Sequence, residues 1–369
     1  MERREIEEVL DAMQAARGSG RHVALATVVR VKGSAYRREG ARMLIRDDGA
    51  ITCMLSGGCL EPDVAEVARR VMARGVPELR HYDLDEDVVW GLGLGCGGSV
   101  DVYIEPVDND PLLARWLDLL SRGDLAVLAM RLSPERQRLL VTSHGETAGG
   151  LGAASLDARV QEVSAEIMAA QSPRAVTRHV QQDGAEAVEV FLDVSAPPPE
   201  LVIFGAGHDA IPVAALAHSL GWHVTIVDGR AAFLTPERFP GARLVLAHPA
   251  QFDAQVVLGA RSYVLIMNHH VERDQAALGI AIRSDAPYVG MLGPRARYET
   301  LLDGLKDEGV VPTPEQLSRV RNPIGLDIGA ESPDEVALSI IAAVLAARRG
   351  FAAGFLDGVS GRIHDPAAR

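Results

Sequence analysis

The spacing of hydrophobic and polar positions changes near the middle of the chain and predicts two regions of different architecture. In the first region, a charged amphipathic start predicts a helix to about Ala16, and further helices are predicted at 61–75, 111–121 and 157–170. Runs rich in β-branched residues predict strands between them, at 22–31, 41–55 (a hairpin), 78–84, 99–107, 124–131, 137–142, 174–180 and 186–194. The pattern leaves the order of these strands open, and no internal repeat is apparent.

After residue 200 the pattern becomes a regular alternation of strand and helix. The stretch SAPPPE at 195–200 precedes it and is expected to be a stiff linker, because consecutive prolines extend the backbone. Alternating strands and helices favour a parallel, doubly wound sheet. We therefore expect an α/β protein with an N-terminal mixed α/β region over 1–195, which has a candidate sub-boundary near 109, and a Rossmann-like domain over 200–369.

Composition and charge narrow the classes of function. The formal charge of −13 argues against nonspecific nucleic-acid binding and against a polybasic membrane anchor. No apolar run reaches the ~18 residues of a membrane span, and the charged start MERREIEEVL does not read as a signal peptide. Three cysteines do not make a disulfide framework in a chain of this length, so a reducing cytoplasm is the expected location.

The second region carries a dinucleotide-binding signature. The stretch FGAGHDA at 204–210 reads Gly-x-Gly-x-x-Ala, follows an apolar strand and precedes a helix. Gly205 allows the tight turn and Gly207 lets a diphosphate approach the backbone, with His208 inside the loop. Asp228 ends the next predicted strand, where an acid binds a ribose hydroxyl. The signature predicts a Rossmann fold; whether a nucleotide occupies it stays open.

Polar residues follow two more predicted strands of this region. Asn268 and His269 come after one strand and Arg295 after another. Ligands of open α/β sheets bind at the carboxyl ends of the strands. Adjacent histidines lack the spacing of a structural metal site, so a ligand-facing edge is favoured and no metal site is predicted.

Two of the three cysteines stand beside paired glycines. Cys59 follows Gly57 and Gly58, and Cys96 precedes Gly97 and its neighbour. Glycines permit positive φ and leave a thiol open to approach, and a following helix would lower the pKa of Cys59. Cys53, by contrast, is predicted inside a strand as a small buried hydrophobic residue.

Arginines cluster in the loop before the hairpin. Arg37, Arg38 and Arg42 lie within GSAYRREGAR. They could be solvated, or they could recognise an anion, because guanidinium groups match phosphate. Together with the exposed thiols, they suit a phosphate-bearing ligand that also carries sulfur or a metal.

Several motifs together resemble the XdhC/CoxI family. They are GSAYRREGARMLI, SGGCLE, GLGCGG, FGAGHDA, NHHVERD and PIGLDIGAESPDEVALSI, in the order that the family shows, over nearly the whole chain. One departure is Tyr36, where the family usually has a proline. The family consists of maturation factors for xanthine dehydrogenase and carbon monoxide dehydrogenase.

The resemblance implies a chaperone that binds the molybdenum cofactor (molybdopterin) and assists its sulfuration and insertion into a molybdenum hydroxylase. The implied partners are the hydroxylase apoenzyme and a cysteine desulfurase, and a homodimer is expected. Cys59 and Cys96 would then lie at the cofactor or sulfur-transfer site. Two other interpretations stay open: an NAD(P)-dependent oxidoreductase using the Rossmann domain, and a thiol-redox protein, although the chain lacks Cys-x-x-Cys.

Overall fold

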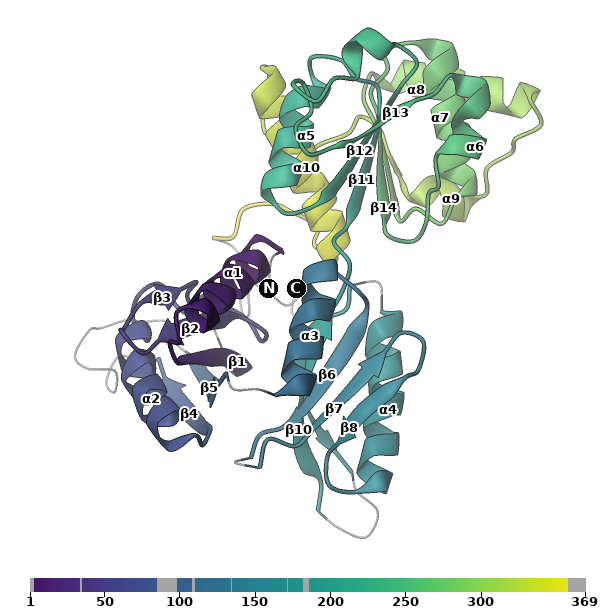
Figure 1. The fold of residues 1–369 in the computed structure, drawn as a ribbon. Helices are drawn as coiled ribbons and strands as arrows, with labels where there is room; N and C mark the ends of the chain where they lie inside the picture. Colours follow the sequence, from purple (N-terminus) through teal and green to yellow (C-terminus); the bar gives the residue numbers. More distant parts are fainter. Residues whose placement is uncertain are drawn as a thin grey trace. The chain divides into compact units, whose positions relative to one another are not determined.

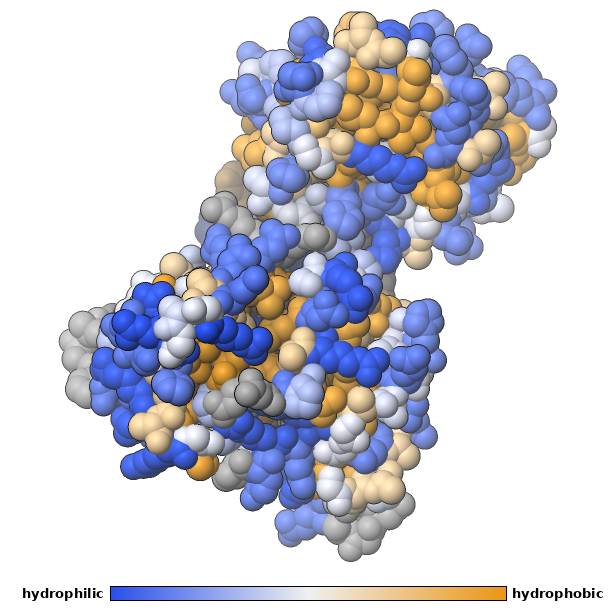
Figure 2. All heavy atoms as spheres, viewed as in Figure 1, coloured by the Kyte–Doolittle hydropathy of each residue, from blue (hydrophilic) through white to orange (hydrophobic). Residues whose placement is uncertain are grey.

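The computed structural model describes residues 3–33, 35–84, 98–107, 110–133, 135–170, 172–181 and 186–357. The chain forms two units, Met1–Pro197 and Pro198–Arg369 (Figure 1). Within each unit, hydrophobic residues show between hydrophilic ones on the face seen in Figure 2. In the described part of the chain, no helix combines the length and the apolar character needed to cross a membrane.

The first half of the N-terminal unit is an antiparallel five-stranded sheet with the strand order β3-β2-β1-β5-β4. One helix precedes the sheet in the chain and a second connects β3 to β4. The elements are α1 (Arg3–Gly18), β1 (Val23–Gly33), β2 (Arg42–Arg46), β3 (Ile51–Thr52), α2 (Glu61–Arg74), β4 (Glu78–Asp83) and β5 (Gly98–Pro106).

The second half of this unit repeats the first. Its antiparallel sheet has the order β8-β7-β6-β10-β9, which is the same order with every strand number raised by five. A helix again precedes the sheet, and another again connects the third strand to the fourth. The elements are α3 (Pro111–Arg122), β6 (Ala126–Arg131), β7 (Arg138–Thr142), β8 (Thr147–Gly150), α4 (Ala154–Ala169), β9 (Val176–Val180) and β10 (Val188–Ser195).

The strand register shows which positions of the two halves are equivalent. Leu25 of β1 lies opposite Leu44 on one side and Glu105 on the other. Leu128 of β6 lies opposite Leu140 and Asp193 in the same way. The expectation of no internal repeat was therefore wrong. Many hydrophobic sequences satisfy the same packing pattern, so two segments can share a fold without a sequence similarity that is apparent by inspection.

Two buried ion pairs join the halves reciprocally. Arg42, the first residue of β2, pairs with Asp193 of the second half, and Arg138, the first residue of β7, pairs with Glu105 of the first half. The two arginines occupy equivalent positions, and so do the two acids. Burial lowers the pKa of Arg42 to about 10, against the opposing charge of Glu5, so the guanidinium stays charged at neutral pH. The Arg42 side chain is thus a structural group within the unit.

Three hydrophobic cores follow from this arrangement. One lies between the first sheet and α2, and a second lies between the second sheet and α4. The third combines the other faces of both sheets with α1 and α3, and contains the fully buried Trp116 and Phe191. Because this core draws on both halves, burying its apolar surface requires both to be folded.

The C-terminal unit is a six-stranded parallel sheet with the order β13-β12-β11-β14-β15-β16, and it confirms the expected Rossmann-like doubly wound domain. Helices α5 and α10 cover one face and α6, α7 and α8 the other (Figure 1). The strands are β11 (Glu200–Phe204), β12 (His223–Asp228), β13 (Arg243–Leu246), β14 (Ser262–Ile266), β15 (Tyr288–Met291) and β16 (Val320–Arg321). The helices are α5 (Ala210–Ser219), α6 (Phe252–Gln255), α7 (Val271–Arg283), α8 (Arg295–Asp307), α9 (Pro314–Ser318) and α10 (Pro333–Arg349), with 3₁₀ turns η1 (Ala231–Phe233) and η2 (Pro249–Gln251).

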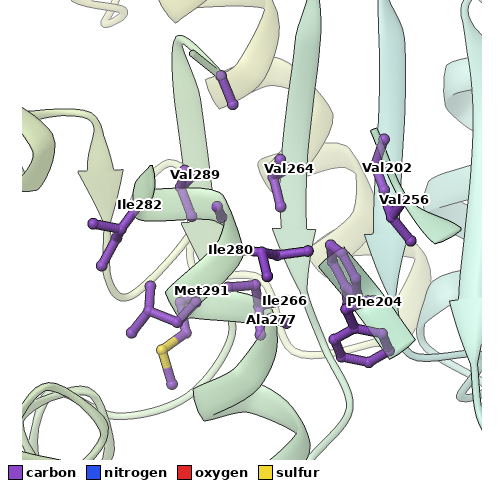
Figure 3. Close-up of a cluster of buried hydrophobic side chains, with 14 of the residues drawn as sticks. Val202, Phe204, Val256, Val264, Ile266, Ala277, Ile280, Ile282, Val289 and Met291 are labelled. Atoms are coloured by element: carbon purple, nitrogen blue, oxygen red, sulfur yellow. The ribbon is translucent and has the colours of Figure 1, made fainter. Parts of the chain in front are cut away.

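The central strands of this sheet are apolar on both faces. Val202 and Phe204 of β11 pack toward α7, beside Val264 and Ile266 of β14 (Figure 3). The alternate residues of the same strands pack toward α5 and α10. Continuous apolar runs are typical of parallel strands covered by helices on both sides. Helix α10 has an N-terminal cap: the Ser332 hydroxyl oxygen accepts from the Glu335 backbone N–H, and Pro333 is the first helical residue.

Cys53 is not inside a strand, contrary to expectation. Strand β3 ends at Thr52, and Cys53 follows it in a left-handed conformation with φ 62°. Its side chain is half-buried against α1, where the thiol approaches the carbonyl oxygen of Glu5 and the carboxylate of Glu8. The predicted hairpin is present, with its turn at Asp48–Gly49, but the strand after the turn is shorter than the apolar pattern indicated.

Candidate functional site

The loop before α2 is organised around one carboxylate. The Glu61 side chain accepts hydrogen bonds from the backbone N–H groups of Leu55, Ser56 and Leu60, and from the Ser56 hydroxyl. The Ser56 hydroxyl oxygen in turn accepts from the backbone N–H of Cys59 at 3.0 Å. Burial acts to raise the pKa of Glu61, but these hydrogen bonds outweigh it and hold the pKa below its ordinary value. The Glu61 carboxylate is therefore ionised, and its hydrogen bonds fix the position of both ends of the loop.

Between these ends, the glycines leave space open. A Cβ atom built on Gly57 or Gly58 would meet no heavy atom within 4 Å, and Gly58 has φ +108°. Both glycines are exposed, and the Cys59 side chain is half-buried. The loop can therefore admit a bulky group close to its backbone and next to a thiol.

The equivalent loop in the second half makes a matched comparison. LSGGCLE at 55–61 corresponds to LGAASLD at 151–157, and Asp157 accepts from the Leu151 backbone N–H as Glu61 does from Leu55. Helix α4 begins at Ala154, the position equivalent to Gly58, whereas α2 begins only at Glu61. Alanine favours helix and glycine opposes it, so the paired glycines keep Cys59 outside the helix.

The structure pairs Arg37 with a carboxylate of α1, close enough to Cys53 to act on its pKa. Its guanidinium donates to both carboxylate oxygens of Glu5, at 2.6 and 2.8 Å. Burial, together with the charges of Glu5 and Glu8, raises the pKa of the Cys53 thiol to about 11, and Arg37 opposes this only in part. Cys53 is therefore held as a protonated thiol at neutral pH.

The other site residues predicted in this unit lie in different surroundings. Arg38 is half-buried in the loop before β2. Arg42, with its partner Asp193, is buried and structural. Cys96 and Gly97 lie outside the described residues. Ser56 and Glu61 were missed by sequence reasoning, although the spacing of an acid two positions after Cys59 was visible at the start of the predicted helix.

In the C-terminal unit, the turn after β11 has the predicted geometry. Gly205 has φ +117°, and a Cβ on it would lie 2.5 Å from the Met267 carbonyl oxygen, so only glycine fits. Its N–H bonds the Val227 carbonyl of the neighbouring strand. Ala210 is fully buried at the start of α5, as close packing of helix and strand requires.

Asp228 lies at the predicted strand end, but its oxygens already have partners. One accepts from the Ala206 N–H and the other from the Arg230 N–H, each at 2.8 Å. The Arg230 guanidinium binds both oxygens, at 2.9 and 2.7 Å, and Arg273 lies 3.9 Å away. Burial acts to raise the pKa of Asp228, yet the bonds from Arg230 and Ala206 lower it overall. Asp228 thus fixes the glycine turn, and sequence reasoning missed Arg230 two residues beyond it.

The polar residues after β14 and β15 form two separate groups. Asn268 is buried and donates to Asp274, whose carboxylate also pairs with Arg297. His269 is exposed, with φ 57°, and its Nε2 lies 2.7 Å from Asp209 Oδ2. His208 is exposed, and so is Arg295, which pairs with Glu299 along α8 at 3.3 Å. Over the described ranges, no group of three or more His, Cys, Asp or Glu residues could hold a metal ion.

Comparisons with known proteins match both units. The signature described as the XdhC and CoxI family matches residues 16–83, and the signature of the XdhC Rossmann domain matches residues 201–344. A Bacillus subtilis protein described as a probable xanthine dehydrogenase subunit is 31% identical over 88% of this chain and 93% of its own length. The molybdenum cofactor insertion chaperone PaoD of Escherichia coli is 24% identical over 89% of this chain and 85% of its own.

A solved structure agrees in both sequence and fold. The crystal structure of a protein described as a xanthine dehydrogenase from Bacillus halodurans superposes with a TM-score of 0.75 at 29% identity. The match covers 94% of this chain and 96% of that one. Agreement of the sequence motifs, the Rossmann domain and near-full-length relatives leads to one conclusion: this chain belongs to the XdhC and CoxI family.

Proposed function

We propose that the protein is a maturation factor that binds the molybdenum cofactor and assists its sulfuration and insertion into a molybdenum hydroxylase, such as xanthine dehydrogenase or carbon monoxide dehydrogenase. The observation that carries the proposal is the near-full-length similarity to a molybdenum cofactor insertion chaperone. The cofactor is cargo for such a protein. Its partners would be the hydroxylase apoenzyme and a cysteine desulfurase, with the factor itself acting as a homodimer.

The loop at 55–61 is the part of the N-terminal unit that fits this cargo best. The open side of Gly57 and Gly58 offers room for a large ligand, and Cys59 supplies a soft sulfur donor next to it. The Ser56–Glu61 hydrogen bonds hold the Cys59 backbone in one place. Holding a donor on a fixed backbone lowers the entropy cost of binding. We propose Gly57, Gly58 and Cys59 as cargo contacts, with Cys96 and Gly97 as candidates on sequence grounds.

The proposal is tested by anaerobic purification from cells that make the cofactor, followed by molybdenum and pterin analysis. Wild-type protein should retain molybdopterin, and Cys59→Ala should lose most of it. Cys53→Ala is the control, because its thiol is protonated and lies against α1. Equal retention by the Cys59→Ala and wild-type proteins would remove Cys59 from the site.

A relocated thiol sharpens the same experiment. Ser155 is equivalent to Cys59 in the second half, but it lies in α4 and lacks the paired glycines. The double variant Cys59→Ala/Ser155→Cys should therefore fail to restore retention. Restoration would show that a thiol in either half suffices and that the loop geometry is unimportant.

The alternative function, an NAD(P)-dependent oxidoreductase, is favoured only by the Rossmann topology. Tight binding of NAD(P) by protein that carries no molybdopterin would support it. The groups at the strand ends, Asp228 and Asp209, are engaged with Arg230 and His269. A dinucleotide would bind at these strand ends, so both contacts affect whether it can bind.

A further inference from the structure

A carboxylate of the protein itself lies against the second glycine of the Rossmann turn. In such turns this glycine lacks a side chain so that a diphosphate can approach the backbone. A Cβ atom built on Gly207 would instead collide with Oδ1 of Asp209. The space that a side chain on Gly207 would occupy is therefore already filled by the Asp209 carboxylate.

Two contacts hold Asp209 in this position. Oδ1 accepts from the Ala210 N–H at 3.1 Å, as the cap of α5. Oδ2 lies 2.7 Å from Nε2 of His269, which belongs to the loop after β14. The left-handed backbone of His269, with φ 57°, is an uncommon conformation for a residue other than glycine, and it presents the ring to Asp209.

The pair spans the place where ligands enter this kind of sheet. Strand β11 has β12 on one side and β14 on the other, so the chain order reverses between β11 and β14. Ligands bind in the crevice beyond such a switch point. Asp209 follows β11 and His269 follows β14, so their contact bridges this crevice.

Electrostatics then opposes a diphosphate in two ways. The carboxylate cap already accepts from the Ala210 N–H and lies at the positive end of the α5 dipole, where a phosphate would bind. A phosphate brought beside Asp209 would also meet a like charge, and juxtaposed like charges oppose binding. Asp228 offers no compensation, because its buried oxygens are bound to Arg230 and Ala206.

We propose that Asp209, held by His269, is a specificity-determining residue that fills the diphosphate position of the Rossmann turn. The C-terminal unit consequently discriminates against NAD(H), NADP(H) and other ligands that place a diphosphate on this turn. The inference concerns the C-terminal unit alone and does not depend on where the N-terminal unit holds its cargo.

The test measures binding of ADP-ribose, which carries a ribose-linked diphosphate without nicotinamide, to the full-length protein by isothermal titration calorimetry. Asp209→Asn removes the charge and keeps an oxygen that can cap α5, and Asp209→Ala removes both. Both variants should bind ADP-ribose at least tenfold more tightly than wild type. Circular dichroism and thermal unfolding establish that each variant is folded. If loss of the cap destabilises Asp209→Ala, Asp209→Asn still tests the effect of the charge.

A matched control separates the local effect from the overall charge. Asp253→Asn also removes one negative charge from the same unit, but Asp253 lies on α6 and pairs with Arg283 at the surface. It should bind ADP-ribose as weakly as wild type. The proposal is overturned if wild type binds as tightly as Asp209→Asn, if neither Asp209 variant gains affinity, or if Asp253→Asn gains as much.

Discussion

In the first half of the N-terminal unit, Glu61 holds an open loop that carries two glycines and Cys59. In the second half, Asp157 holds the equivalent turn, but Ala154 and Ser155 belong to helix α4. The acid at the start of the helix is common to both halves. The glycines, the thiol and the hydroxyl of Ser56 belong to the first half only.

This difference separates what the fold needs from what it does not. Features shared by both halves, such as the acid and the reciprocal arginine pairs, are the candidates for what the repeated fold requires. Features found in one half are not required for it, so they are the better candidates for function. The match to the family signature at 16–83 also lies within the first half.

The largest loss of stability is expected at the two buried ion pairs that join the halves. Arg42→Leu leaves Asp193 buried without its partner and should lower the free energy of unfolding by about 3–5 kcal/mol. Arg138→Leu should cost at least as much, because it leaves Glu105 buried without this partner and also removes the ion pair with Asp110. Urea denaturation followed by circular dichroism measures both.

Two controls make this result specific. Arg69→Leu, which breaks an exposed pair with Glu66 on α2, should change the free energy of unfolding by less than about 1 kcal/mol. The double variant Arg42→Leu/Asp193→Leu should recover most of the loss, since no buried charge remains unpaired. A loss below about 1 kcal/mol in Arg42→Leu would contradict the reciprocal-pair interpretation.

A smaller loss of stability is expected when Glu61 or Asp157 is neutralised, and the loss should differ between the two. Glu61→Gln disturbs hydrogen bonds from three N–H groups and a hydroxyl and should cost about 2 kcal/mol, whereas Asp157→Asn should cost about 1 kcal/mol. The folded-state pKa of Glu61 is lowered, so its contribution is complete above the ordinary glutamate value and is lost as the pH falls through the folded pKa.

The measurement compares unfolding free energies at pH 7 with those at pH 4 and below. The gap between wild type and Glu61→Gln should narrow over this acidic range, provided that the protein stays folded there. Equal losses for Glu61→Gln and Asp157→Asn at pH 7 would show that the bonds through Ser56 contribute nothing to stability.

The thiols should differ by about tenfold or more in alkylation rate. Burial and the charges of Glu5 and Glu8 raise the pKa of Cys53 to about 11, so at pH 8 almost none of it is the reactive thiolate. Cys59, beside the open glycines, should react first with iodoacetamide in the native protein. Peptide mass spectrometry follows all three cysteines, and faster labelling of Cys53 would refute the expectation.

The smallest effect is expected at Gly57. Its added Cβ would meet open space, so Gly57→Ala should change the free energy of unfolding by less than about 0.5 kcal/mol. Gly58→Ala should cost about 1 kcal/mol or more, because φ +108° is strained for alanine. Thermal unfolding of the pair tests this. A large loss in Gly57→Ala would mean that the loop is packed against something in solution.

The candidate site was predictable to very different degrees in the two units. The Gly205 turn and the buried Ala210 follow from a local motif, and they were found where the sequence placed them. The partner of Arg37 was not predictable, because Glu5 lies 32 residues away and meets it only through tertiary packing. Arg230, two residues after Asp228, is a local partner that the motif does not include. The roles assigned to the individual site residues stay predictions until the variants above are measured.

By itself, the sequence determined the family, the doubly wound C-terminal sheet and most helices, since these depend on local periodicity, caps and motifs. Only the tertiary structure decided the strand order of the N-terminal unit, the repeat of that order in its two halves, and the ion pairs that Arg42 and Arg138 form between the halves. It also decided that Asp209 meets His269 across the crevice. Strand pairing and ion pairing join residues far apart in the chain, and a periodic pattern carries no information about which distant partner each residue will find.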